Sequence, residues 1–171
     1  MNRVAKFEKV SEKQYIADYL NIFKGGNENF IKENIYSKIV LPTRSTSGSA
    51  GYDFVSPIGF TLKPGETIKI PSGIRCKMNN DYVLMLFPRS SLGFKYRLQI
   101  DNTIPVVDSD YYNADNEGHI FIKLTNDSKE DKVINVSAGD RIVQGIFLPY
   151  GITEDDNVDV DRTGGFGSTG R

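Results

Sequence analysis

Residues 82–93, YVLMLFPRSSLG, contain the longest uninterrupted apolar run of the chain and the turn that follows it. The six apolar residues at 82–87 come after the turn signal NND (79–81) and before Pro88. A short apolar run between turn signals predicts a β-strand, and six residues are far fewer than a membrane-spanning helix needs.

Similar short runs lie on both sides of this strand in the sequence. They are IVL (39–41), TIKI (67–70), GIRCKM (73–78), IPVV (104–107), HIFIKLT (119–125), KVINV (132–136) and RIVQGIFL (141–148). Turn signals such as KPG (63–65) and AGD (138–140) separate them. Many short strands with regular turns predict an all-β sandwich, jelly roll or barrel. The pattern does not alternate strands with helices, which argues against a doubly wound sheet.

The pattern divides the chain into a helical extension at 1–33, a β domain at 34–153, and a linker with a Gly-rich arm at 154–171. In the extension, Ser11 and Gln14 have the spacing of a helix capping box. The apolar residues that then share one helical face are Tyr15, Ile16, Tyr19, Leu20 and Phe23. We expect this face to dock on the β domain or on a neighbouring subunit.

Length, charge and the numbers of cysteines and histidines exclude several classes of protein. The chain has 171 residues and 19.1 kDa, enough for one domain, and its 21 basic and 22 acidic residues leave a net charge of −1. This balance argues against a generic nucleic-acid surface. A single cysteine and a single histidine exclude an intrachain disulfide and metal centres built from several of either residue. The first ten residues lack the apolar stretch of a signal peptide, so we expect a soluble cytoplasmic protein with no membrane partner.

The turn after the apolar run has the chemistry of a phosphate site. Arg89 supplies a guanidinium, and Ser90 and Ser91 supply hydroxyls at the end of the predicted strand. The segment lacks the frame of a Walker loop. An ordinary capped turn or helix start is the alternative interpretation.

The tail GGFGSTGR (164–171) has a similar character. Its glycines free the backbone to wrap closely around a ligand. Arg162, Ser168 and Thr169 offer charge and hydroxyls to phosphate oxygens, and Phe166 offers a flat ring to a base. A C-terminus that packs on nothing is the alternative.

The segment VVDSDY (106–111) places Asp108 and Asp110 on one side of an extended chain, with Tyr111 next to them. Such a carboxylate can act as a general base for water, although paired carboxylates are also common in turns. AGYD (50–53) and GDRIVQ (139–144) each resemble a turn that enters a strand. With one histidine in the chain, a Ser-His-Asp triad is not credible.

Together, five segments resemble the five motifs of the trimeric dUTP pyrophosphatase (dUTPase) family, in their order and approximate spacing. They are AGYD (50–53), PRSSLG (88–93), VVDSDY (106–111), GDRIVQ (139–144) and RTGGFGSTG (162–170). The resemblance implies a distorted β jelly roll of the β-clip type, assembled as a homotrimer. It also implies three active sites at subunit interfaces, each closed by the tail of a neighbour.

The resemblance also implies the reaction. Asp108 would orient and deprotonate a water that attacks the α-phosphorus of dUTP, releasing dUMP and pyrophosphate, which limits uracil in DNA. Tyr111 would stack under the deoxyribose and leave no room for a 2′-hydroxyl, so that UTP is rejected. Asn102 and the backbone around Phe121 would read the uracil edge, where a polar mismatch discriminates strongly.

The implied phosphate contacts come from two parts of the chain. Those in the β domain are Arg89, Ser90, Ser91 and Gln144. Those in the tail are Arg162, Ser168 and Thr169, with Phe166 covering the uracil and Gly167 beside it in the same site. The implied cofactor is Mg²⁺, held by the three phosphates and by water because this ion dehydrates reluctantly. Asp53 would lie near metal-bound water, and Asp140 and Arg141 would be structural.

The sequence departs from the family pattern at three places. Pro105 stands where the family usually has glycine, so a base contact through its N–H must be lost or rerouted through the carbonyl. The spacing between Arg162 and Phe166 is one residue shorter than usual. Residues 112–118 form a polar insert, which is either a tolerated loop or a protein-recognition element.

The insert and the N-terminal extension resemble additions found in some phage-encoded dUTPases, so we expect a phage-encoded member acting in the host cytoplasm. Binding of a repressor or another regulatory protein through 112–118 would be a second activity. The alternatives to dUTP hydrolysis are a dCTP deaminase-like enzyme and a purely regulatory binding module.

Overall fold

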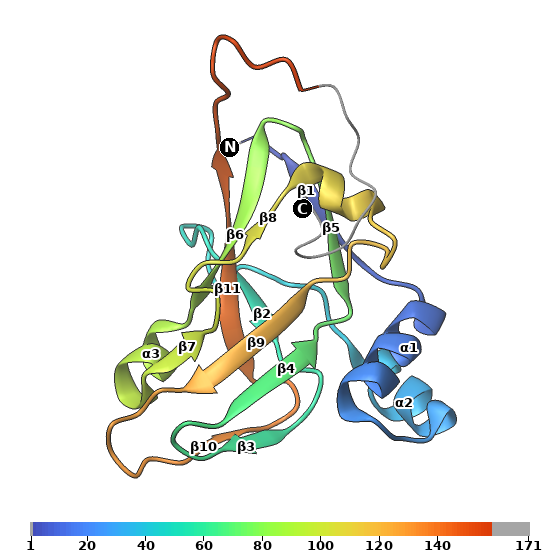
Figure 1. The fold of residues 1–171 in the computed structure, drawn as a ribbon, viewed down its shortest axis with the longest axis vertical. Helices are drawn as coiled ribbons and strands as arrows, with labels where there is room; N and C mark the ends of the chain where they lie inside the picture. The colour runs from blue at the N-terminus through green and yellow to red at the C-terminus, as the bar shows by residue number, and fades with distance from the viewer. Residues whose placement is uncertain (1, 159–171) are drawn as a thin grey trace.

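The computed structural model describes residues 2–158, and these residues form an all-β core with helices at its edges (Figure 1). The strands are β1 (Ala5–Lys9), β2 (Tyr52–Val55), β3 (Phe60–Leu62), β4 (Thr67–Pro71), β5 (Ile74–Met78), β6 (Tyr82–Pro88), β7 (Leu98–Ile100), β8 (Val106–Val107), β9 (Phe121–Asn126), β10 (Ile134–Val136) and β11 (Arg141–Pro149). The α-helices are α1 (Glu12–Phe23), α2 (Glu28–Asn34) and α3 (Ser90–Tyr96), and the 3₁₀ helices are η1 (Tyr36–Lys38) and η2 (Ser109–Asn113).

The strands pair in four small antiparallel sheets. The largest has the order β2-β11-β6-β8, and a three-stranded sheet has the order β4-β9-β7. The two remaining sheets are the pairs β1-β5 and β10-β3. This arrangement confirms the predicted all-β class, and its short, interrupted sheets account for a distorted rather than a regular jelly roll.

Strand β11 is a central strand of the largest sheet, because it pairs with β6 along seven residues and with β2 on its other edge. Core side chains pack closely against the backbone of Gly145. A Cβ there would approach Leu84 Cδ1 to 2.8 Å and Phe54 Cε2 to 3.0 Å, so only glycine lets the neighbouring side chains close over the strand. Leu84 and Phe54 are almost completely buried as a result.

The N-terminal extension is only partly helical, which corrects the prediction for 1–33. Residues 5–9 form strand β1, paired with β5 so that Phe7 lies opposite Cys76. The reason is local: residues 5–8 alternate apolar and polar side chains, the period of a strand, and Phe7 is buried while Lys6 is exposed. The extension therefore completes the β core as well as covering it.

Helix α1 begins where the capping box predicts. The Ser11 hydroxyl accepts a hydrogen bond from the Gln14 N–H at 3.1 Å, and Tyr15 on the predicted apolar face is fully buried. The helix ends at Phe23, and its C-cap residue Lys24 has a left-handed φ of 54°. Among the described residues, no helix has the length and apolar character needed to cross a bilayer.

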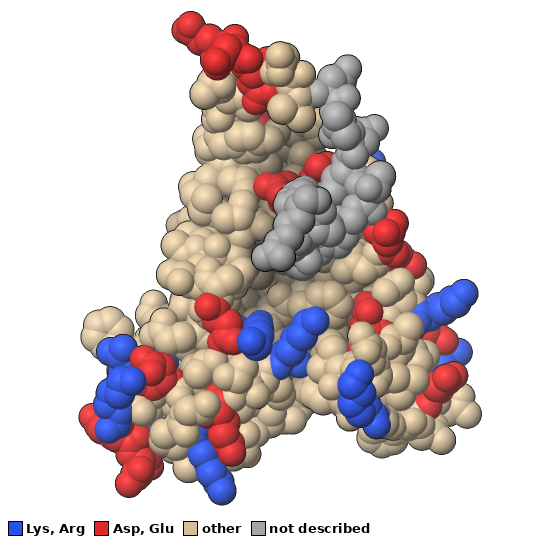
Figure 2. Space-filling model, in the orientation of Figure 1, with Lys and Arg blue, Asp and Glu red and all other residues tan. Residues whose placement is uncertain are grey.

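Charged side chains of both signs are interspersed on the face shown in Figure 2. Side chains of both signs gather around the lower end of the molecule, where the helices and the β3-β10 pair lie, and a further group of acidic side chains lies at the upper end. The described residues of this face therefore form no extended basic surface for a polyanion.

Candidate active site

Strand register brings three of the five motifs together at one end of the largest sheet. Gln144 on β11 lies opposite Asp53 on β2 and Phe87 on β6. Its side-chain Nε2 is 3.5 Å from the Pro88 carbonyl oxygen. A Cβ on Gly51 would be 2.6 Å from the Gln144 Oε1, so the glycine of the first motif makes room for the glutamine of the fourth.

Asp53 is the centre of an ion-pair network at this end. Its carboxylate oxygens lie 3.3 Å from Arg89 Nε and 3.2 Å from Arg141 Nη1, and the Ser45 hydroxyl donates to it at 2.8 Å. Only 11% of the Asp53 side chain is exposed. Two guanidinium groups beside the carboxylate disfavour the approach of a metal cation. The geometry therefore favours a role for Asp53 in orienting Arg89 over a role in contacting metal-bound water.

Arg89 opens onto a hollow of about 410 Å³. The residues that line it are Arg89, Ser91, Leu92, Asn135, Val136, Gly139, Asp140 and Arg141. Ser90 and Ser91 are exposed in the first turn of α3, directly after Arg89. Two guanidinium groups and a serine hydroxyl at one hollow suit phosphate oxygens. Arg141, predicted as structural, therefore lies on the phosphate side of the site.

Asp140 has the turn role that was predicted for it. Its carboxylate accepts a hydrogen bond from the Ser137 N–H at 2.7 Å, and its own N–H donates to the Ser137 carbonyl. Gly139 completes the turn with a φ of +92°. The turn holds the start of β11 and thereby the position of Arg141.

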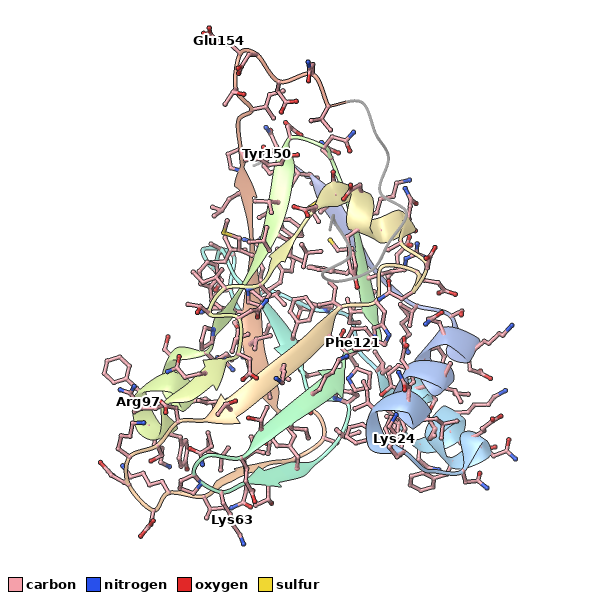
Figure 3. The ribbon with its side chains drawn as sticks, viewed as in Figure 1. Lys24, Lys63, Arg97, Phe121, Tyr150 and Glu154 are labelled. Carbon is pink, nitrogen blue, oxygen red and sulfur yellow. The ribbon has the colours of Figure 1, made fainter. Side chains whose placement is uncertain are left out.

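The remaining predicted residues of the β domain lie together elsewhere. Asp108 follows β8 and precedes η2, and Tyr111 is buried, with its hydroxyl donating to the His119 carbonyl at 2.8 Å. The His119 and Phe121 rings pack in a tilted arrangement with their centroids 4.6 Å apart. Figure 3 shows Phe121 at the start of β9, at the end of the strand nearer helix α1.

Asn102 sits in the turn after β7, which pairs with β9. The turn is held by Asp101, whose N–H donates to the Lys123 carbonyl and whose carboxylate is 2.7 Å from Lys123 Nζ. Although burial raises the pKa of the Asp101 carboxyl, hydrogen bonds from Lys123 and Thr125 hold it below its usual range. Asn102 is thereby placed beside the Phe121 end of β9.

Asp108 and Arg89 are far apart within one chain. Val107 pairs with Leu84, so Asp108 lies next to the Val83 position of β6. Arg89 follows six residues after Val83, directly after the end of this strand, a separation of about 20 Å. One chain therefore presents the predicted base and the arginine predicted for the phosphates at opposite ends of β6.

Pro105 supports the strand ladder. It is buried, and its carbonyl oxygen accepts a hydrogen bond from the Leu86 N–H at 3.0 Å, which extends the pairing of β6 with β8. The carbonyl that was predicted as a rerouted base contact is thus already used by the sheet. Arg162, Phe166, Gly167, Ser168 and Thr169 lie outside the described residues.

His119 is the site residue that sequence reasoning missed, since it was considered only as a triad member. It lies between Tyr111 and Phe121 and contacts both. Its position as the first residue of the predicted strand at 119–125 was a signal in the sequence. A larger hollow of about 880 Å³, beside β1 and the end of β11, contains none of the predicted site residues in its described lining.

The antiparallel β fold, with two arginines at one hollow and a carboxylate near buried aromatic rings elsewhere, has the features of a β-clip nucleotide hydrolase. The family model that matches is dUTPase, over residues 37–170. The chain belongs to the dUTPase family.

Relatives and solved structures agree with this assignment. The deoxyuridine 5′-triphosphate nucleotidohydrolase of Lactococcus lactis subsp. lactis is 44% identical over 135 residues, covering 77% of this chain and 89% of that protein. The dUTPase structure from Streptococcus mutans is 33% identical, with a TM-score of 0.62 and coverage of 86% of this chain and 98% of that one. A dUTPase from phage phi11 of S. aureus is 19% identical with a TM-score of 0.62, which shows the shared fold. The predicted family, fold class and enzyme class are confirmed.

Proposed function

We propose that this dUTP diphosphatase uses Asp108 as the base that deprotonates the attacking water, with water adding to the α-phosphorus and pyrophosphate leaving. Arg89, Ser90 and Ser91 bind the phosphates, and Gln144 contacts the phosphates or the water. The observation that carries the assignment of the phosphate site is the strand register, which places Gln144 beside Asp53 and Pro88, and so beside Arg89. Positioning and charge stabilisation then supply most of the rate enhancement.

We assign the nucleoside to the residues that lie near the start of β9. Tyr111 stacks under the deoxyribose and excludes a 2′-hydroxyl, and Asn102 and the backbone around Phe121 read the uracil. From the tail, Arg162, Ser168 and Thr169 hold the γ-phosphate, and Phe166 and Gly167 close over the base. Support comes from the shared location of Tyr111, Phe121 and the Asn102 turn beside the start of β9.

Mg²⁺ fits this chain as part of the nucleotide complex. Within residues 2–158, no three His, Cys, Asp or Glu side chains gather as a metal cage, and the Asp53 carboxylate is engaged by two arginines. The triphosphate and water would hold the ion, and any contribution of Asp53 would pass through water. Bound there, the ion supplies charge neutralisation on the phosphates.

We further propose that the complete site forms between copies of the chain in a homotrimer. Support comes from the separation of about 20 Å between the Asp108 and Arg89 positions along β6, which is too long for one nucleotide's α-phosphate to contact both. A neighbouring copy then supplies the missing half, and the tail of a neighbour closes the site.

The first experiment measures pyrophosphate release from dUTP, dCTP, dTTP and UTP with Mg²⁺, using the wild-type chain and Asp108→Asn. We expect hydrolysis of dUTP alone and its loss in the variant. Deamination of dCTP would instead identify the deaminase-like alternative. Full activity of Asp108→Asn would overturn the assignment of the base.

Complementation tests the shared site. Asp108→Asn and Arg89→Ala chains, each inactive alone, are mixed, dissociated and reassembled. Because sites formed between unlike chains contain both native residues, activity should return at about a quarter of the sites. Sedimentation should give about three times the mass of one chain. A mixture that stays inactive while forming mixed oligomers would contradict a site shared in this way.

Regulatory binding through residues 112–118 stays a prediction. Two side chains of the insert, those of Tyr112 and Glu117, bind the chain's own N-terminal segment, and Asn113 and Asp115 are its exposed positions. These two positions are therefore the most accessible to a repressor. Asn113→Ala with Asp115→Ala, compared with deletion of 112–117, separates this role from dUTP hydrolysis; unchanged partner binding in both would exclude it.

A further inference from the structure

The buried His119 ring is fixed on both sides. Its Nε2 accepts a hydrogen bond from the Gly73 N–H at 2.8 Å, and its Nδ1 lies 2.6 Å from Asp18 Oδ2. Because a backbone N–H donates to Nε2, this hydrogen-bond network places the ring proton on Nδ1, from which it is donated to Asp18. The ring cannot rotate without leaving a buried donor unsatisfied.

His119 in turn contacts both aromatic residues assigned to the nucleoside. Its ring packs against the Phe121 ring in a tilted arrangement, with the centroids 4.6 Å apart and the planes inclined by 37°. Its carbonyl oxygen accepts the Tyr111 hydroxyl at 2.8 Å. Asn116 from the insert donates to the same hydroxyl at 2.7 Å, so the Tyr111 ring is held at its polar end from two sides.

Asp18 is itself held in place by the N-terminal helix and the insert. Gln14 Nε2 donates to Asp18 Oδ2 at 3.0 Å. The start of the helix is tied to the insert, because the Ser11 N–H and hydroxyl each donate to a Glu117 carboxylate oxygen at 2.7 Å. Helix α1 and the insert thus form one support behind Tyr111 and Phe121.

We propose that Asp18 and Asn116 are positioning residues for the nucleoside end of the site: Asp18 acts through His119 on Tyr111 and Phe121, and Asn116 acts directly on the Tyr111 hydroxyl. This inference rests on the proposed roles of Tyr111 and Phe121 in binding deoxyuridine. The N-terminal helix and the insert, which the family pattern does not require, thereby set how sharply the enzyme distinguishes dUTP from UTP. Neither residue touches substrate.

The test compares kcat and KM for dUTP and UTP in the wild-type chain, Asp18→Ala and Asp18→Asn. Loss of the acceptor lets the His119 ring move, so Asp18→Ala should raise KM for dUTP about tenfold and lower the dUTP-to-UTP ratio of kcat/KM, with kcat within about twofold. Asp18→Asn keeps an oxygen acceptor and should restore both quantities. Lys13→Ala, at an exposed position of the same helix, is the matched control and should match wild type.

A folded, active Asp18→Ala enzyme with wild-type KM and wild-type discrimination would overturn the proposal, even if its melting temperature falls. If Asp18→Ala does not fold, Asn116→Ala provides the test, because it removes a donor from the Tyr111 hydroxyl without touching helix α1. An unchanged dUTP-to-UTP ratio of kcat/KM in Asn116→Ala would then contradict the proposal. Wild-type activity that depends on Asp108 shows that the proposed function stands while only this inference fails. Absence of dUTP hydrolysis by the wild-type chain would overturn both.

Discussion

At the scale of single residues, Gly118 shows how tightly the insert is closed. Its φ is +69°, and a Cβ there would lie 2.7 Å from the Tyr111 carbonyl oxygen and 2.8 Å from the Tyr112 Cα. We predict that Gly118→Ala lowers the free energy of unfolding by about 2–3 kcal/mol, from strain at this φ and from the backbone clash. Urea unfolding measures it. Gly25→Ala, where a Cβ meets open space, is the control and should stay within about 0.5 kcal/mol.

Asp53 offers a second test at this scale, because two roles for it predict different kinetics. Its contacts with Arg89 and Arg141 predict that Asp53→Asn loosens both guanidinium groups and raises KM for dUTP about tenfold. A role through metal-bound water predicts instead a higher Mg²⁺ concentration for half-maximal rate. Steady-state rates at varied dUTP and varied Mg²⁺ distinguish the two, and a shift in the Mg²⁺ requirement alone would contradict the arginine role.

At the scale of elements, helix α1 has an N-terminus completed from far away in the sequence. A capping box takes the acceptor for the N-cap N–H from within the helix, but here Gln14 turns to Asp18 and Glu117 accepts both Ser11 donors. Tyr112 makes a parallel connection, with its hydroxyl donating to Glu8 at 2.6 Å and the Arg75 guanidinium 3.6 Å above its ring centre. The insert is therefore fastened to β1, β5 and α1.

The Glu117 contact predicts a pH-dependent contribution to stability. Burial raises the pKa of the Glu117 carboxyl, but the hydrogen bonds from Ser11, with a smaller contribution from Arg75, hold it below the ordinary value of 4.5. A lowered pKa in the folded state means that the stabilisation is present above 4.5 and is lost as the pH falls through the folded value.

We therefore expect Glu117→Gln to lower the free energy of unfolding by about 1 kcal/mol near neutral pH. The difference from wild type should shrink at a second, acidic pH below the folded-state pKa of Glu117, because the wild-type carboxylate is protonated there. Urea unfolding at the two pH values measures this, with Glu33→Gln on the exposed side of α2 as the control. A difference that is independent of pH would show that the charge contributes nothing.

At the scale of the whole molecule, the N-terminal segment belongs to the core even though the family match begins at residue 37. Strand β1 pairs with β5 along its five residues. The buried Phe7 ring lies 5.4–5.6 Å from the rings of Tyr52, Phe54 and Phe147. Removing the segment would expose this aromatic cluster and an edge of β5.

We predict that a chain starting at residue 35 does not fold cooperatively. Loss of one buried Phe alone costs about 3–5 kcal/mol, a large part of the stability of a domain this size. Thermal unfolding followed by circular dichroism measures the effect, and Phe7→Ala in the full chain isolates the aromatic contribution. A truncated chain that melts like the full one would show that the segment is only an appendage.

The amino-acid sequence by itself determined the all-β class, the family and the identity of most candidate site residues. These depend on local signals: apolar runs between turn signals, the Ser11 cap with its Gln14 spacing, and short motifs such as PRSSLG (88–93) in which chemistry and turn geometry coincide. The strand at 5–9 was also local, since its alternation was present in the sequence, but it was interpreted as part of a helical extension.

Only the tertiary structure decided how these pieces are arranged. The division of the motifs between the two ends of β6 follows from strand register, and the support behind Tyr111 depends on contacts such as Ser11 with Glu117 and Asp18 with His119. These partners are about a hundred residues apart in the chain. No local pattern encodes such pairs, because their energy comes from burial and satisfied hydrogen bonds that exist only once the core has formed.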